Sequence, residues 1–253
     1  MSSVRWFMCL AFLLAVKGGE SPLPQRQTRC LILVMADGVR WQEVFRGASA
    51  ELLESEAADC PPEWFSGGLS GRRRAIMPWV WTYLRSHGQI LGNRDKGSRM
   101  EVANRAHLSY PGFAETLCGF PVPGLEGNQS IWNPVASILE RIEPTPGFRG
   151  RVAAFATWRH FPWILRKSAC GFPVISGDDP VPEQGMPAEV VELNRRKRVE
   201  KRRFPTGPAD ELTVEGAVAY LAAAKPRLLL VVLDEPDEWA HEGCYVGYLR
   251  AIQ

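Results

Sequence analysis

Residues 30–45 read CLILVMADGVRWQEVF, and this segment sets the frame for the rest of the chain. The apolar run at residues 31–35 is long enough for one strand buried on both faces. It would deliver the carboxylate of Asp37 to the carboxyl end of the strand, where open α/β sheets collect ligands. Gly38 permits a sharp turn and a close approach to the backbone. The alternative is that Asp37 only caps the following helix.

Composition excludes several classes of protein. The chain has 253 residues, 45% hydrophobic and 23% charged, which is ordinary for a soluble globular protein of one large or two small domains. A formal net charge of +2 is too small to indicate a nucleic-acid partner. The basic run at residues 195–203 is interleaved with Glu200 and follows Glu189 and Glu192, which predicts a solvated helix face. No CxxC pair is present, which excludes a zinc finger.

The N-terminal segment predicts export. Arg5 precedes a wholly apolar run at residues 6–16, and small residues follow at Gly18 and Gly19. The run is shorter than the roughly 20 residues that span a bilayer, but it suits the core of a secretory signal. We expect residues 1–20 to be a signal peptide, residues 21–253 to form one domain, and the protein to be periplasmic or extracellular without a stable membrane span. An uncleaved anchor is the alternative.

The order of the predicted elements indicates the fold class. Apolar segments at residues 151–158 and 227–234 predict two further strands. Helices are expected at residues 76–87, 113–118, 135–142, 188–203, 210–224 and 245–252. A short strand is expected at residues 89–92, and loops are expected at residues 57–71 and 235–243. Strands that alternate with helices predict a three-layer α/β/α sandwich with a largely parallel sheet.

Acidic residues follow two of the predicted strands. Asp37 follows the first, Asp237 follows the third, and His241 lies four residues beyond Asp237. A carboxylate and an imidazole at this spacing can reach one ion, and oxygen and nitrogen ligands suit zinc or a similar divalent cation. The alternative is an ordinary surface pair.

Ser109 is a candidate nucleophile. It precedes Tyr110-Pro111-Gly112, so a rigid turn can hold its hydroxyl in place. A serine bound to a metal loses its proton more easily and becomes able to attack phosphorus. The alternative is that Ser109 caps the helix expected at residues 113–118.

Three ordered segments together resemble the alkaline phosphatase superfamily. They are DGVRWQEVF at residues 37–45, NRAHLSYPGFAETLCGFP at residues 104–121 and LDEPDEWAHEG at residues 233–243. The resemblance is to the nucleotide pyrophosphatase/phosphodiesterase-like branch and to exported bacterial relatives with an SYPG motif. It implies an alkaline phosphatase-like fold, two divalent metal ions expected to be Zn²⁺, and hydrolysis of a small phosphate mono- or diester.

The resemblance also implies roles for individual residues. Asp37 and Ser109 would bind one metal, and Asp237 and His241 would bind the other. Ser109 would be the nucleophile and would carry a phospho-serine intermediate. Asn128 would contact the phosphate, with Asn133 as its competitor. Arg40, Trp41 and Trp239 flank these positions and are expected to shape the substrate pocket.

The chain departs from the family at two points. Phe113 stands where sulfatases of the superfamily need arginine, which argues against a sulfatase. The family's later Asp-His pair and further His have no counterpart, since His87, His107 and His160 all precede the Asp-x-x-x-His motif. We therefore expect a C-terminally incomplete domain with an exposed sheet edge and a tendency to aggregate. The alternative function is a catalytically inactive secreted relative or fragment that serves as a binding or structural module.

Overall fold

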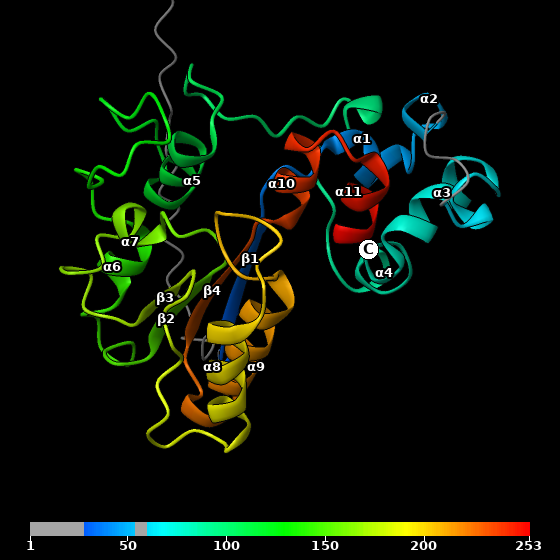
Figure 1. Cartoon of the computed structure of the whole chain (residues 1–253). Coiled ribbons are helices and arrows are strands. Elements are labelled where there is room, and N and C mark those ends of the chain that lie inside the picture. Colours follow the sequence, from blue (N-terminus) through cyan, green and yellow to red (C-terminus); the bar gives the residue numbers. More distant parts are fainter. Residues whose placement is uncertain (1–27, 54–59) are drawn as a thin grey trace, which may run out of the picture.

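A computed structural model of the chain describes residues 28–53 and 60–253, so the expected leader at residues 1–20 lies outside the described ranges. The described strands are β1 (Leu31–Ala36), β2 (Val152–Ala156), β3 (Val174–Ser176) and β4 (Leu228–Leu233). They form one sheet in the order β1-β4-β2-β3, and every neighbouring pair is parallel (Figure 1). The register pairs Leu31 with Leu228 and Ala36 with Leu233. The predicted α/β class with a parallel sheet is confirmed.

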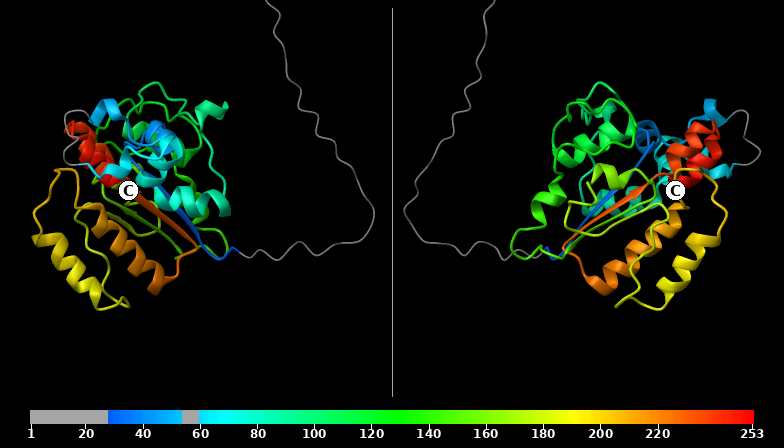
Figure 2. Two further views of the ribbon diagram at one scale, coloured as in Figure 1. Left: turned by 90° about the vertical axis from the view of Figure 1, so that its right-hand side faces the viewer. Right: turned by 60° about the vertical axis from the view of Figure 1, so that its left-hand side comes forward.

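Helices cover both faces of the sheet. One layer contains α5 (Ser109–Cys118), α6 (Ile138–Ile142) and α7 (Phe161–Ile164), and the other contains α8 (Glu189–Val199) and α9 (Asp210–Ala224). Ala154 and Leu230 belong to the core under the first layer, and Phe155 and Val231 to the core under the second. The two cores use alternate residues because successive side chains of a strand point to opposite faces. Figure 2 shows the sheet between the two layers, an α/β sandwich.

A third group of helices lies near the carboxyl end of β1 (Figure 1). It contains α1 (Trp41–Arg46), α2 (Ala50–Leu53), η2 (Pro62–Trp64), α3 (Gly68–Ile76), η3 (Val80–Leu84), α4 (Arg85–His87), η4 (Arg94–Lys96), α10 (Glu235–His241) and α11 (Tyr245–Ala251). Leu53, Trp64, Ile76 and Leu249 form the centre of its own core and are fully buried. This core joins the segment after β1 to the segment after β4, so the two strand ends are held together from outside the sheet.

Several local expectations were wrong. β3 was not expected, because three residues are too few to show a strand period. Residues 89–92 form no strand, and residues 68–71 belong to α3 rather than to a loop. The helix expected at residues 76–87 is confirmed over residues 78–87, but its middle, η3, is π-helical and α4 ends it. Residues 235–241 form α10 where a loop was expected, since Pro236 occupies the first turn of a helix without cost there.

β1 is an edge strand whose apolar side chains are exposed. Leu31 is 59% exposed and Val34 is 60% exposed, and β4 is the only strand that pairs with β1 among the described residues. An apolar edge without a charge, a proline or a bulge is a template for pairing with another chain. The geometry therefore agrees with the exposed edge expected from the sequence.

We expect the purified chain to self-associate through β1, and Val34→Lys to reduce that association, because a lysine on an edge strand opposes pairing. The measurement is static light scattering over a range of protein concentrations. Val218→Lys on α9 is the matched control, since Val218 is 58% exposed but lies on a helix. If the two substitutions have equal effects, or if the parent chain does not associate, the exposed edge of β1 is not the surface through which the chain self-associates.

Candidate active site

A pocket of ≈ 520 Å³ opens at the carboxyl end of β1 and β4. Its lining comes from four separate segments and includes Asp37, Ser109, Asn128, Asp237 and His241. These are the five residues proposed from the sequence for metal binding, nucleophilic attack and phosphate contact. The fold thus brings together residues that are far apart in the chain, although the roles themselves remain predictions.

The turn after β1 explains why Asp37 lies close to Asp237. The backbone N–H of Asp37 donates to the carbonyl oxygen of Leu233 at 2.9 Å, which extends the β1–β4 pairing by one residue. Gly38 follows with a φ of 72°, and a Cβ at this position would lie 2.5 Å from the Cα of Asp237. The turn therefore packs directly on the first residues of α10. Only glycine combines this conformation with so close an approach.

Ser109 is the first residue of α5, and its hydroxyl lies close enough to Asp37 to lower the pKa of that carboxyl. The N-cap position belongs to Leu108, which makes no side-chain cap bond. The interpretation of Ser109 as a helix cap is therefore wrong. Its side chain is directed to the end of β1 instead.

A hydrogen-bond network fixes the loop that leads to Ser109. The carboxylate of Glu115 on α5 accepts the backbone N–H of Asn104 at 2.9 Å and its side-chain amide at 2.7 Å. The Oδ1 of Asn104 then accepts the backbone N–H groups of Ala106 at 3.1 Å and His107 at 3.0 Å. His107 has a φ of 51°, in the left-handed region that non-glycine residues seldom adopt. The network holds this strained residue two positions before Ser109.

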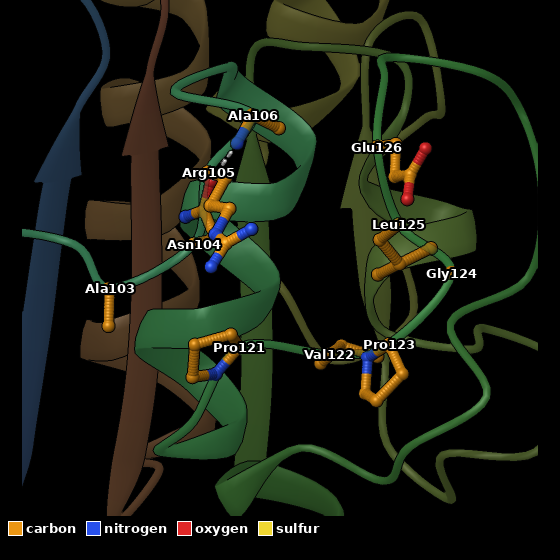
Figure 3. Close-up of a pocket in the computed structure, with 10 residues that line it drawn as sticks. All are labelled: Ala103, Asn104, Arg105, Ala106, Pro121, Val122, Pro123, Gly124, Leu125 and Glu126. Atoms are coloured by element: carbon orange, nitrogen blue, oxygen red, sulfur yellow. Dashed lines mark hydrogen bonds between the residues drawn. The ribbon is translucent and has the colours of Figure 1, made fainter.

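The same loop separates the candidate site from a second pocket. Residues 103–106 form one wall of that pocket and residues 121–126 form the other, around ≈ 580 Å³ (Figure 3). Val102 and His107, on either side of residues 103–106, line the candidate site instead. The loop therefore lies between the two pockets, and its hydrogen bonds to Glu115 hold it in place.

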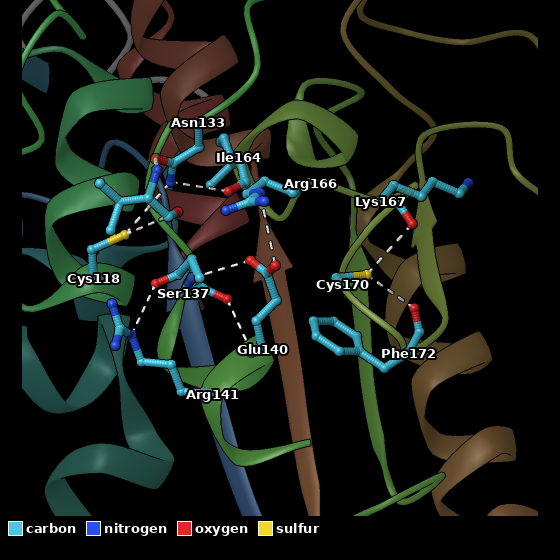
Figure 4. A network of polar contacts seen from close by, with 12 residues as sticks. Cys118, Asn133, Ser137, Glu140, Arg141, Ile164, Arg166, Lys167, Cys170 and Phe172 are labelled. Carbon is cyan, nitrogen blue, oxygen red and sulfur yellow. Dashed lines mark hydrogen bonds and ion pairs between the residues drawn. The ribbon is translucent and has the colours of Figure 1, made fainter. Parts of the chain in front are cut away.

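The two competing asparagines have different environments. The Oδ1 of Asn128 accepts the backbone N–H of Tyr110 at 2.9 Å, which leaves its amide N–H groups as the donors available to the pocket. Asn133 is 2% exposed, and its Nδ2 donates to the carbonyl oxygen of Ile164 at 3.2 Å while its Oδ1 accepts the backbone N–H of Val135. Figure 4 shows Asn133 beside Cys118 in a network that ties α5 to α7. Asn133 is thus structural, and Asn128 is the candidate.

Asp237 and His241 lie one turn apart on α10, so their side chains share a face of the helix. Nε2 of His241 is 3.2 Å from Oδ2 of Asp237, and the His241 side chain is 77% exposed. The spacing thus brings a carboxylate and an imidazole together, as the sequence predicts. The histidine faces the open side of the pocket.

The N-terminus of α10 is fixed from α9. The carboxylate of Asp210 accepts the backbone N–H groups of Asp234 at 3.0 Å and Glu235 at 2.9 Å, and the hydroxyl of Thr157 at 2.5 Å. Asp210 is the first residue of α9, whose N-cap is Ala209. This carboxylate positions the segment that carries Asp237.

Sequence reasoning missed Asp234 as a site residue. The β1–β4 register pairs Ala36 with Leu233, the last residues of the two strands, so Asp37 and Asp234 each directly follow one of two neighbouring strands. Burial raises the pKa of Asp37 to about 6, with Asp237 as the second cause. Burial and the charge of Asp37 raise the pKa of Asp234 to about 8. The sequence shows that an Asp follows each of these two strands. Only the pairing of the strands shows that the two aspartates lie at neighbouring strand ends.

The donor chemistry of the pocket fits a divalent cation. In the described ranges, no group of three or more His, Cys, Asp or Glu residues is arranged as a metal centre. However, Asp37, Asp234 and Asp237 place three carboxylates at one end of the sheet, and the Oδ2 of Asp234 is buried without a hydrogen-bond partner. Carboxylates that raise one another's pKa repel one another. A bound cation would neutralise this repulsion and would give the Oδ2 of Asp234 the partner that it lacks.

We expect the metal-free protein to lose stability as the pH rises. The folded-state pKa values of Asp37 and Asp234 are about 6 and about 8, above the usual 3.8. At pH values between the usual pKa and the folded-state pKa, the folded state therefore binds more protons than the unfolded state. Each group thus adds stability below its usual pKa that is lost as the pH passes its folded-state pKa, at up to about 1.4 kcal/mol per pH unit. Urea unfolding with a chelator measures this, and stability that increases between about pH 5 and pH 8 would contradict it.

The residues expected to shape the pocket do not line it. Arg40 forms an ion pair with the fully buried Glu43. Trp41 lies 4.7 Å from the guanidinium of Arg46, and Trp239 packs edge-on against Phe204. None of the three flanking residues is among those that surround the pocket. Their contacts stabilise the helices around the site, and their side chains do not form the wall of the pocket.

Comparison with known proteins gave no assignment: no family model, no curated protein and no solved structure matches the chain. Among residues 28–53 and 60–253, no helix has both the length and the apolar character needed to cross a membrane. The functional argument therefore depends on the geometry of the pocket.

Proposed function

We propose that the protein is a metal-dependent phosphoric ester hydrolase with an alkaline phosphatase-like site, acting on a small phosphate mono- or diester. One observation carries the proposal. Ser109, at the start of α5, lies beside Asp37, which follows β1, in a pocket that Asn128, Asp237 and His241 also line. This is the arrangement expected of a nucleophile beside a cation site.

Two cations, expected to be Zn²⁺, would be held by Asp37 with Ser109 and by Asp237 with His241. They would neutralise the phosphoryl charge and stabilise the attacking and departing oxygens. The mutual repulsion of the carboxylates supports this assignment, because their charge has to be balanced before an anionic substrate can enter.

The chain's own groups have distinct tasks. The carboxylate of Asp37 lies beside Ser109 and would orient its hydroxyl. The hydroxyl oxygen attacks phosphorus: the Oγ–P bond forms, the ester P–O bond breaks, and the departing oxygen takes up the proton that the hydroxyl loses. Water then attacks the phospho-serine: a P–O bond to the water oxygen forms, the Oγ–P bond breaks, and a proton from the water restores the hydroxyl of Ser109. The amide of Asn128 donates to a phosphoryl oxygen.

One observation favours the second candidate, a catalytically inactive relative that binds a ligand or serves as a structural module. Within the described part of the chain, the His, Cys, Asp and Glu side chains do not already form a three-ligand centre. Structural zinc sites use four protein ligands and catalytic zinc sites three. The two candidates differ in whether bound metal leads to turnover.

The test is turnover of p-nitrophenyl phosphate and bis-p-nitrophenyl phosphate before and after chelation. We expect chelation to abolish turnover and Zn²⁺ to restore it, because the site needs positive charge to bind and polarise the ester. The ratio of the two rates distinguishes a monoesterase from a diesterase. Turnover that resists chelation would contradict the metal dependence. No turnover with any divalent metal would contradict the proposal and favour the inactive relative.

A further inference from the structure

The carboxylate of Asp234 occupies an unusual position. It directly follows β4, as Asp37 directly follows the neighbouring β1, and the residue is only 3% exposed. Its Oδ2 is buried and has no hydrogen-bond partner among the described residues. A buried carboxylate oxygen without a partner is destabilising and uncommon in folded proteins.

The surroundings of Asp234 do not compensate its charge. Apart from burial, the groups that most raise its pKa are Asp37, Glu238 and Asp210, and all three are acids. Two arginines of the adjoining segments are engaged elsewhere, Arg40 with Glu43 and Arg203 with Glu242. Asp210 is itself held by Thr157 and by the start of α10, so it cannot turn away.

We propose that Asp234 is a ligand of a divalent cation that it shares with Asp37, through the Oδ2 that has no hydrogen-bond partner in the described part of the chain. Two carboxylates that directly follow adjacent parallel strands supply the oxygen ligands that Mg²⁺, Mn²⁺ and Zn²⁺ accept. The inference deepens the proposed function, because it adds a protein ligand to the cation assigned to Asp37 and Ser109. This ligand comes from the strand that leads into α10, not from a later part of the chain.

The competing role for Asp234 is a permanently protonated acid with no ligand. The near-isosteric Asp234→Asn distinguishes the two roles, because an amide imitates the protonated acid but is a far poorer cation ligand. If Asp234 were only a neutral buried group, the substitution would change neither metal affinity nor the metal-dependent rise in melting temperature.

The experiment uses the full chain, treated with a chelator and titrated with Mn²⁺ by calorimetry, together with thermal melts with and without Mn²⁺. We expect Asp234→Asn to lower the affinity by at least about tenfold, as loss of a ligand does. It should also raise the melting temperature of the metal-free form, because a buried, repelling carboxylate has been removed. Asp178→Asn is the control, since Asp178 is exposed and paired with Arg202.

The metal-free melt reports whether each variant is folded. Asp234→Ala, which removes the carboxylate without adding an amide, must lose Mn²⁺ binding as well. Wild-type affinity in either folded variant, or no Mn²⁺ binding by the parent chain, overturns the inference. Binding that depends on Asp234 without ester turnover would support the ligand and refute the hydrolase. Ester turnover together with Mn²⁺ binding that the Asp234 substitutions do not change would support the hydrolase and refute Asp234 as a ligand.

Discussion

Gly38→Ala is expected to cost more than about 4 kcal/mol of folding stability, which places it among the most damaging single substitutions. The added Cβ would lie 2.5 Å from the Cα of Asp237, a backbone atom that cannot rotate away. The left-handed conformation adds about 1–2 kcal/mol for any residue with a Cβ. Relief requires that the turn after β1 separate from α10, which would also move Asp37 away from Asp237.

Urea unfolding of Gly38→Ala, followed by far-UV circular dichroism, measures this effect. Gly97→Ala is a matched control, because Gly97 has a φ of 73° and a Cβ there meets nothing within 4 Å. The control should lose only the conformational part, about 1–2 kcal/mol. If both variants lose the same stability, the close packing of the β1 turn on α10 is not what holds the site together.

Ser109→Ala is expected to reduce ester turnover by about 10³-fold or more, the scale seen when a covalent nucleophile is removed. The fold should be retained, because alanine is a strong helix former and the backbone of Ser109 already lies in α5. The loss would therefore appear in the rate and not in the melting temperature. The effect is large because Ser109 is the proposed covalent nucleophile and lies beside Asp37 in the pocket.

Turnover and thermal melts of the same preparation separate chemistry from stability. Ser86→Ala is the control, since the Ser86 hydroxyl bonds to backbone carbonyls within its own exposed helix. Acid-quenched wild-type protein should yield a phosphorylated peptide that contains Ser109, and the variant should not. A Ser109→Ala protein that keeps its turnover would remove the covalent step from the account.

The elements that the sequence predicts well are those whose signal is local. β1, β4 and α9 each have an uninterrupted apolar or periodic pattern, and α9 spans the expected residues 210–224. β3 has three residues and gains its place only by pairing with β2. α10 was missed because its sequence, EPDEWAH, has no apolar period, and the helix is stabilised by Asp210 from another element.

The candidate site divides in the same way. Asp37, Ser109, Asp237 and His241 stand in recognisable motifs, so the sequence could point to each of them. Asp234 lies within the segment at residues 233–243, but the resemblance gives it no role. Its place near Asp37 follows from the β1–β4 pairing, which a single sequence does not contain. The bonds from Glu115 to the loop before Ser109 are likewise contacts across a turn that residue types alone do not specify.

The most direct test of the central claim is the divalent metal content of the purified chain, measured by elemental analysis after dialysis against buffer that contains Zn²⁺. The account predicts close to two metal ions per chain, and fewer in a protein that carries Asp37→Asn together with His241→Ala. A chain that retains no metal, or that binds equal amounts with and without these side chains, would contradict a metal-dependent site in the pocket at the end of β1 and β4.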